Sequence, residues 1–128
     1  MGEAENREVI NRLYQQVWTA ETPRFDAMSE SFGEDAVVEY PQSGERIRGR
    51  ESIRAAEENY PGLPKVTMRR QLAVGHLVVM ETRLDYQGKL YDECSIFELR
   101  DAMIVRLTTY FAEPFEAPSS RARWVERM

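Results

Sequence analysis

Four long segments rich in β-branched and aromatic residues fill the second half of the chain, and only one or two residues separate each from the next. These segments are Val66–Val74, His76–Tyr86, Lys89–Arg100 and Met103–Phe111. The breaks fall at Gly75, at Gln87–Gly88 and at Asp101–Ala102, which are turn-forming sequences. The sequence therefore predicts a run of neighbouring antiparallel strands.

The first half of the chain has the spacing of helices. Apolar residues recur every three or four positions from about Glu5 to Ala20, and a second, shorter helical pattern covers Phe25–Phe32. A short strand is predicted at Ala36–Tyr40, and a third helix begins near Gly49. Helices followed by strands predict an α+β fold in which a curved antiparallel sheet wraps around three N-terminal helices. We expect residues 1–128 to form a single domain.

Charge and composition limit the classes of function. The net charge of −5 and the pI near 5.0 argue against binding to nucleic acid or to anionic membranes. No apolar run is long enough to span a bilayer and Met1–Glu5 is acidic, so we expect a soluble, cytoplasmic protein. One cysteine and one histidine are too few for a disulfide or a zinc site, and no phosphate-binding glycine loop occurs. We therefore predict no metal and no cofactor.

A row of charged residues at every second position marks the second long strand. Glu81, Arg83 and Asp85 share one face of this strand, because side chains two apart on a strand point the same way. The row is either the wall of a charged cavity or a ladder of exposed ion pairs on the surface. The first interpretation favours an enzyme, and the second favours a small folded domain without chemistry.

Two parts of the chain together carry a resemblance to known proteins: Ser31–Pro41 with Gly49–Ile53, and Ile96–Asp101 with Ile104–Val105 and Tyr110–Phe111. They resemble the nuclear transport factor 2-like superfamily, which includes SnoaL-like polyketide cyclases, ketosteroid isomerases and limonene epoxide hydrolases. The resemblance implies a cystatin-like cone, formed by a bent sheet around three helices, with a mostly apolar pocket and often a homodimer. It also implies a small apolar partner of the polyketide, terpenoid or steroid kind. The reaction is not implied, since this scaffold hosts many unrelated chemistries.

The segment Glu81–Asp85 is similar to the epoxide-hydrolase segment in which Arg-x-Asp supplies two members of a charged, water-activating triad. Arg83 and Asp85 match these two members, but the position of the third, an aspartate, holds Thr109. The resemblance therefore suggests Arg83 and Asp85 as catalytic residues while leaving the triad incomplete.

The isomerase branch suggests a different set. Tyr14 matches the tyrosine that donates a hydrogen bond to the substrate oxyanion, while the general base and the second donor of that branch fall at Tyr40 and Ser95. Neither position holds an acid, so proton transfer would need a substitute such as Asp85 or Glu81.

Together these arguments predict two groups of site residues on one face of the sheet and its first helix. The predicted catalytic residues are Arg83, Asp85 and Glu81, and the predicted substrate-binding residues are Tyr14, Trp18, Tyr40, Glu93, Ser95 and Thr109. Two functions stay open. The chain is either a cofactor-free isomerase, cyclase, hydratase or hydrolase that uses acid/base chemistry, or a non-catalytic ligand-binding or dimerisation domain.

Overall fold

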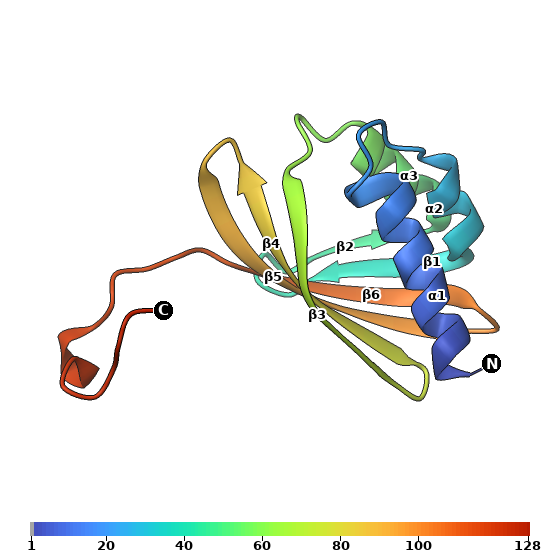
Figure 1. Ribbon diagram of the computed structural model, residues 1–128. Helices are drawn as coiled ribbons and strands as arrows, with labels where there is room; N and C mark the ends of the chain where they lie inside the picture. The colour runs from blue at the N-terminus through green and yellow to red at the C-terminus, as the bar shows by residue number, and fades with distance from the viewer. Residues whose placement is uncertain (1) are drawn as a thin grey trace.

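The computed structural model describes residues 2–128, with its α-helices within residues 3–58 and its strands within residues 32–112. The elements are α1 (Glu3–Leu13), the π-helical turn η1 (Tyr14–Trp18), α2 (Asp26–Ser31), β1 (Phe32–Tyr40), β2 (Glu45–Arg48), α3 (Arg50–Glu58), β3 (Lys65–Val74), β4 (Leu77–Tyr86), β5 (Lys89–Arg100), β6 (Met103–Ala112) and the 3-10 turn η2 (Ser119–Arg121). Figure 1 shows the helices gathered on one side of a strongly bent sheet.

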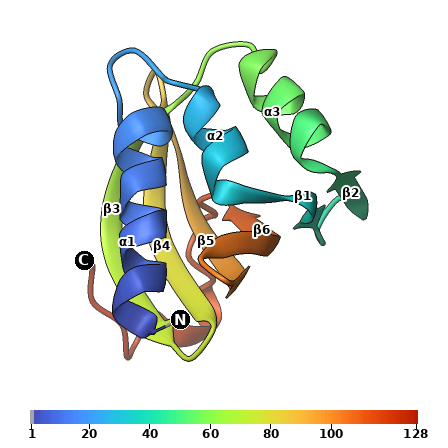
Figure 2. The same cartoon turned by 90° about the vertical axis from the view of Figure 1, so that its right-hand side faces the viewer.

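The six strands form one mixed sheet in the order β2-β1-β6-β5-β4-β3. Its concave face wraps around the helices, so the α+β cone predicted from the sequence is confirmed (Figures 1 and 2). The expectation of a wholly antiparallel sheet is wrong for one pair, because β1 runs parallel to β6. No hairpin joins these two strands, so no tight turn forces them to run in opposite directions.

Two-residue turns join β4 to β5 and β5 to β6. Gln87 and Gly88 connect the first pair, and all four central residues of the two turns, including Asp101 and Ala102, have positive φ angles. This backbone is that of a type I′ turn, whose twist matches the twist of the flanking strands. The turn at Gln87–Gly88 pairs Tyr86 with Lys89 and thereby fixes the register of the whole β4–β5 pair.

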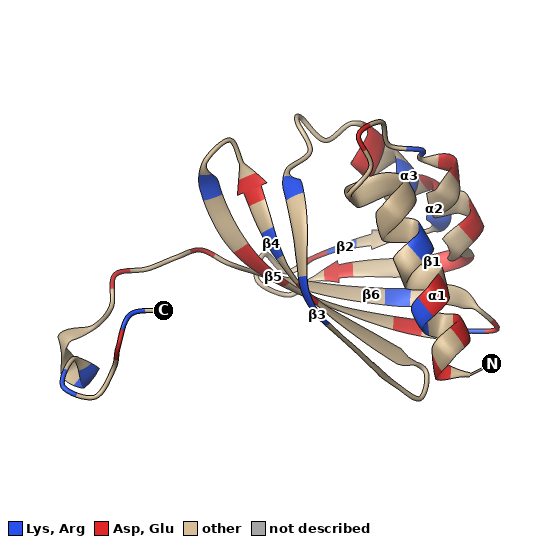
Figure 3. Cartoon of the chain, viewed as in Figure 1, with Lys and Arg blue, Asp and Glu red and all other residues tan. Residues whose placement is uncertain are grey.

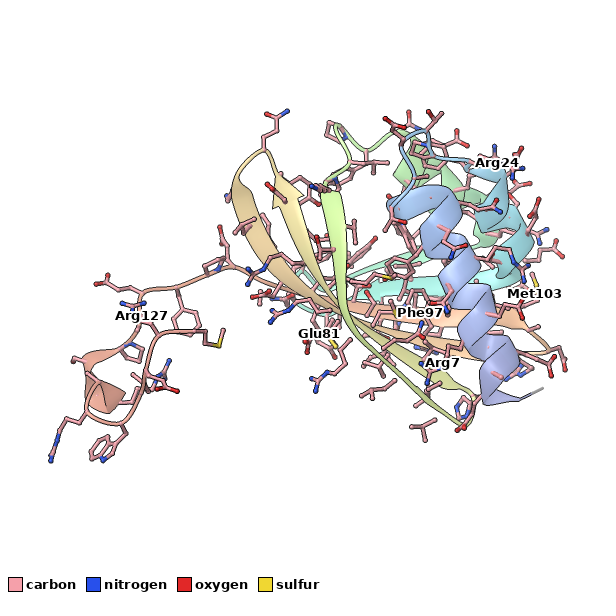
Figure 4. All side chains as sticks on the ribbon, in the orientation of Figure 1. Arg7, Arg24, Glu81, Phe97, Met103 and Arg127 are labelled. Atoms are coloured by element: carbon pink, nitrogen blue, oxygen red, sulfur yellow. The ribbon has the colours of Figure 1, made fainter. Side chains whose placement is uncertain are left out.

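The apolar side of α1 covers one end of the concave face. Val9, Ile10 and Leu13 are buried there, and α1 contacts β3 and β4. Figure 4 places Phe97 of β5 between the sheet and α1, where its side chain is fully buried. The core therefore fills the end of the cone that lies under α1.

The predicted helix over residues 5–20 is two elements. Regular α-helix ends at Leu13, and a π-helical turn follows in which the amide of Thr19 donates to the carbonyl of Tyr14 at 2.8 Å. π-helical turns add one residue to the helical repeat and occur often at functional sites. Here the turn carries both Tyr14 and Trp18 to the inside of the cone.

Two boundaries differ from those predicted. Phe32 and Gly33, expected at the end of the second helix, begin strand β1 instead, since Phe32 pairs with Ile104 of β6. Beyond β6 the chain leaves the sheet and extends away from the cone (Figure 1). The helical turn expected at residues 121–127 lies earlier, at Ser119–Arg121, and Trp124 is exposed.

Candidate functional site

A cavity of about 740 Å³ occupies the end of the cone that α1 leaves uncovered. Residues from η1, α3 and the concave faces of β1, β4, β5 and β6 line it. The curvature of the sheet and the position of α3 keep the two walls apart, so side chains do not fill this end. A cavity of this size can enclose a small organic molecule.

All six residues that the sequence suggested for substrate binding lie on the wall of this cavity. They are Tyr14, Trp18, Tyr40, Glu93, Ser95 and Thr109. They come from four elements, so the fold brings together residues that are far apart in the sequence. Their placement fits the predicted role, and the role itself stays a prediction.

The expectation that Glu81, Arg83 and Asp85 form a wall of the cavity is wrong. The residues of β4 that point inward are the alternate ones, Val78, Met80, Thr82 and Leu84, all of which are buried. The charged row therefore lies on the outer face of the sheet. Figure 4 shows Glu81 on the side of the sheet away from the helices.

Each member of the charged row has a partner outside the cavity. The Glu81 carboxylate is 2.9 Å from Arg70, and Nε of Arg83 is 3.3 Å from a carboxylate oxygen of Asp92. Asp85 accepts a 2.6 Å hydrogen bond from the amide of Gly88 in the turn. Glu81 and Arg83 therefore form the surface ion pairs of the second interpretation, and Asp85 holds the turn instead. Figure 3 shows such acidic and basic positions intermixed along the strands and helices.

Glu93 is the acidic group on β5 that faces the cavity. Its carboxylate accepts a 2.9 Å hydrogen bond from the hydroxyl of Thr82, which lies opposite it on β4. Burial raises the pKa of Glu93 to about 7, the nearby charge of Glu57 acts in the same direction, and the Thr82 hydrogen bond opposes both. Close to neutral pH this carboxyl is therefore present in both protonation states.

Glu57 is a second cavity carboxylate, and reasoning from the sequence missed it. It lies on α3, and its carboxylate accepts a 2.8 Å hydrogen bond from the indole nitrogen of Trp18. Burial also raises the pKa of Glu57. A signal was present in the sequence, because Glu57 lies four residues after the buried Ile53 and so shares its face of the helix.

Tyr14, Ser95 and Thr109 form the polar floor of the cavity. Tyr14 is only 2% exposed, and burial raises the pKa of its hydroxyl, with the charge of Glu93 adding to the effect and a hydrogen bond with Ser95 opposing it. The hydroxyls of Ser95 and Thr109 lie 3.2 Å apart and are buried. The Tyr14 hydroxyl therefore stays protonated and can donate a hydrogen bond to a bound molecule.

Tyrosine side chains surround the opposite end of the cavity. The hydroxyls of Tyr60 and Tyr86 lie 3.4 Å apart, and the ring of Tyr91 packs edge-on against that of Tyr86. Burial raises the pKa of Tyr40 to about 12, with the charges of Glu57 and Glu93 contributing. These tyrosines present apolar ring faces with polar tips.

This arrangement can move a proton without help from a bound group. A carboxyl with a pKa near neutrality can act as general base or general acid, and a neutral phenol can stabilise a developing oxyanion.

Within residues 2–128, no three His, Cys, Asp or Glu side chains are grouped as a metal site requires. None of the helices in that range has the length and apolar character needed to cross a membrane.

Comparison with known proteins agrees with this fold. The family model of the SnoaL-like domain matches residues 10–107. The chain belongs to the SnoaL-like domain family. No curated protein matches this SnoaL-like domain significantly.

Solved structures place the SnoaL-like domain within the NTF2-like superfamily. An NTF2-like protein of unknown function from Burkholderia xenovorans is 37% identical, with 98% of this chain and 97% of that chain covered and a TM-score of 0.85. A putative ketosteroid isomerase from Kribbella flavida is 26% identical, with 98% and 91% covered and a TM-score of 0.88. A putative SnoaL-like polyketide cyclase from Jannaschia is 20% identical, with 85% and 86% covered and a TM-score of 0.72, which shows the fold alone.

Proposed function

We propose that this SnoaL-like domain is a cofactor-free enzyme that binds a small, mostly apolar molecule in the cone and transfers a proton with the carboxyl of Glu93. The observation that carries the proposal is the position of Glu93, a partly buried carboxyl that faces the cavity and has a pKa of about 7. A group that titrates near the working pH is the most effective kind of general acid or base.

The floor of the cavity supplies the second part of the mechanism. In the proposed reaction, the Glu93 carboxylate removes a proton from the carbon next to a substrate carbonyl. The electron pair of that C–H bond forms a C=C bond to the carbonyl carbon, and the π electron pair of the carbonyl moves to its oxygen. The Tyr14 hydroxyl donates a hydrogen bond to this oxyanion, and Glu93 then returns the proton to carbon. Loss and return of one proton can support an isomerisation or a cyclisation. The description of the Kribbella flavida relative as a putative ketosteroid isomerase agrees with this class of reaction.

Deuterium exchange tests the proposal without knowledge of the natural substrate. Small cyclic and aryl ketones are incubated with the protein in deuterated water, and incorporation of deuterium next to the carbonyl is followed by NMR. We expect the wild-type protein to catalyse exchange, Glu93→Gln to lower the rate about 100-fold or more, and Tyr14→Phe to lower it about tenfold or more. Glu30→Gln, at an exposed position on α2, is the matched control.

The alternative function is binding without chemistry. Two results together would favour this alternative. Ketones would perturb the NMR signals of Tyr14 or Trp18, which shows binding in the cavity, and deuterium would enter the ketones no faster with the protein than in buffer alone. Exchange that is equally fast in Glu93→Gln would contradict the role of Glu93.

A further inference from the structure

The charged residues on the cavity wall are almost all acidic. They are Glu45, Glu57, Glu93, Glu113 and Lys89. Lys89 is 3.3 Å from the Glu113 carboxylate, so these two charges pair with each other. In the lining within residues 2–128 no arginine occurs, and Glu57 and Glu93 form no ion pair there. The cavity thus holds acidic groups whose charge no protein cation balances.

Aromatic rings face the same space as the two carboxylates. Trp18 hydrogen-bonds to Glu57, and the charges of both Glu57 and Glu93 act on Tyr40 and on Tyr86. Tyr60 and Tyr91 pack against Tyr86, with ring centroids 6.3 Å and 5.6 Å from it. Faces of tyrosine and tryptophan rings attract cations, most strongly where water is excluded.

From this combination we propose that the ligand of the cavity is an organic cation, a protonated or quaternary amine carried on an apolar body. The inference rests on the proposed function, because it concerns the same cavity, and it adds the charge of the molecule that binds there. Glu93 and Glu57 would face the nitrogen, beside the rings of Tyr40 and Tyr86 on which their charges act. Anionic ligands such as carboxylates and phosphates are excluded by the same charges.

The energetic argument follows from burial. Burying a carboxyl group without a nearby cation disfavours its ionised form. This effect raises the pKa values of both Glu93 and Glu57. A bound cation would supply the missing charge and return both groups to the ionised form. Binding should therefore release protons from the protein near neutral pH.

The pH dependence has a definite sign. Glu93 is faced by Thr82 and Tyr86 from β4, Glu57 from α3, Tyr14 from η1 and Tyr40 from β1. Of these five, only Glu57 is a carboxyl, and burial raises its pKa as it does that of Glu93; burial also raises the pKa of the three tyrosines, which stay neutral near pH 7. Affinity for a cation should thus rise as the pH increases through about 7, when the carboxyl of Glu93 ionises.

A series of three probes with the same apolar cage separates charge from shape. The probes are 1-adamantylamine, which is a cation at neutral pH, 1-adamantanol, which is neutral, and 1-adamantanecarboxylate, which is an anion. Isothermal titration calorimetry at about pH 8 measures their affinities for the full chain. We expect the amine to bind about tenfold or more tightly than the alcohol, and the carboxylate not to bind. Titrations in buffers of different ionisation enthalpy should show proton release on binding of the amine.

Variants then assign the preference to the two carboxylates. Glu93→Gln and Glu57→Gln should each weaken binding of the amine about tenfold more than they change binding of the alcohol. Glu30→Gln is again the control, and thermal melts of each variant establish that it is folded.

Three results overturn the inference. Binding of the alcohol as tightly as the amine refutes the cation preference and leaves the proposed function intact, because the cavity then binds a neutral molecule. Binding of the carboxylate refutes it as well. If none of the three probes binds at millimolar concentration, the inference is also refuted, and deuterium exchange with neutral ketones decides the proposed function separately.

Discussion

The hydroxyl of Thr82 donates a 2.9 Å hydrogen bond to the carboxylate of Glu93 across the β4–β5 pair. Thr82 is completely buried and Glu93 is partly buried, so this hydrogen bond lies at the wall of the cavity. It stabilises the ionised carboxylate and is the cause that opposes the effect of burial on the pKa of Glu93.

Replacing this hydroxyl should therefore raise the pKa of Glu93 above its value of about 7. The substitution Thr82→Val keeps the shape of the side chain and removes the donor. The measurement is the pH titration of carboxyl carbon signals in protein labelled at glutamate. Thr109→Val is the control, because it removes a buried hydroxyl that bonds to Ser95 instead. A titration midpoint that falls, or does not move, in Thr82→Val would contradict the assigned contact.

The raised pKa of Glu93 should also make the stability of the fold depend on pH. Below the ordinary value of 4.5, both the folded and the unfolded chain carry the proton, and burial costs nothing extra. Between 4.5 and about 7 the unfolded chain ionises first, so the free energy of unfolding decreases as the pH rises, and above 7 the decrease is complete. The full loss is up to about 3 kcal/mol.

Glu93→Gln should remove this part of the pH dependence. Urea unfolding at several pH values should show that the variant gains stability relative to the wild type as the pH rises through this window. Glu30→Gln should follow the wild type throughout. An equal change in stability with pH in wild type and Glu93→Gln would show that Glu93 titrates normally.

Arg83 should be dispensable for the site. Its side chain is 43% exposed on the outer face and pairs with Asp92. We expect Arg83→Ala to change the free energy of unfolding by less than about 1 kcal/mol and to leave the deuterium exchange rate and the affinity for 1-adamantylamine unchanged. A large decrease in the exchange rate or in the affinity for 1-adamantylamine would mean that Arg83 on the outer face affects the structure of the cavity.

The outer face of the sheet also carries apolar residues that a second copy of the chain would cover. Leu72 and Val74 on β3 are 50% and 69% exposed, and Val79 of β4 lies opposite Leu72. If the predicted homodimer forms through this face, Leu72→Glu should convert dimer to monomer in size-exclusion chromatography with light scattering. Val125→Glu, at a similarly exposed position in the C-terminal segment, is the control. Dissociation by Val125→Glu alone would assign the contact to that segment.

The sequence predicted the long strands well because their ends are marked by tight turns. Strand β5 has the predicted limits, and β3, β4 and β6 differ from prediction by one residue at one end. Strand β1 was predicted too short, since Phe32 and Gly33 fit the end of a helix locally and are recruited to the sheet by pairing with β6. Pairing between distant segments is not encoded in local spacing.

The charged row Glu81, Arg83 and Asp85 was assigned to the wrong face of the sheet because the start of β4 is apolar on both faces. The apolar start of β4, Leu77–Met80, has large side chains on both faces, so it does not show which face is inward. The two-residue turn at Gln87–Gly88 does show it, because it places odd-numbered residues of β4 opposite even-numbered residues of β5. Glu93 and Ser95 thus share a face with Thr82 and Met80 and lie on the opposite face from Glu81.

The parallel pair of β1 and β6 has a consequence for how the molecule assembles. Tight turns join strands β3 to β6, so these strands can pair with their neighbours in sequence. Val38 of β1 instead pairs with Leu107 of β6, which is far away in the sequence. Closing that long loop costs more entropy, so β1, together with the helix α3 that follows it, should dock late in refolding. Helix α3, which bears Glu57, would then be among the last elements to pack. An early folding intermediate would therefore lack the enclosed cavity.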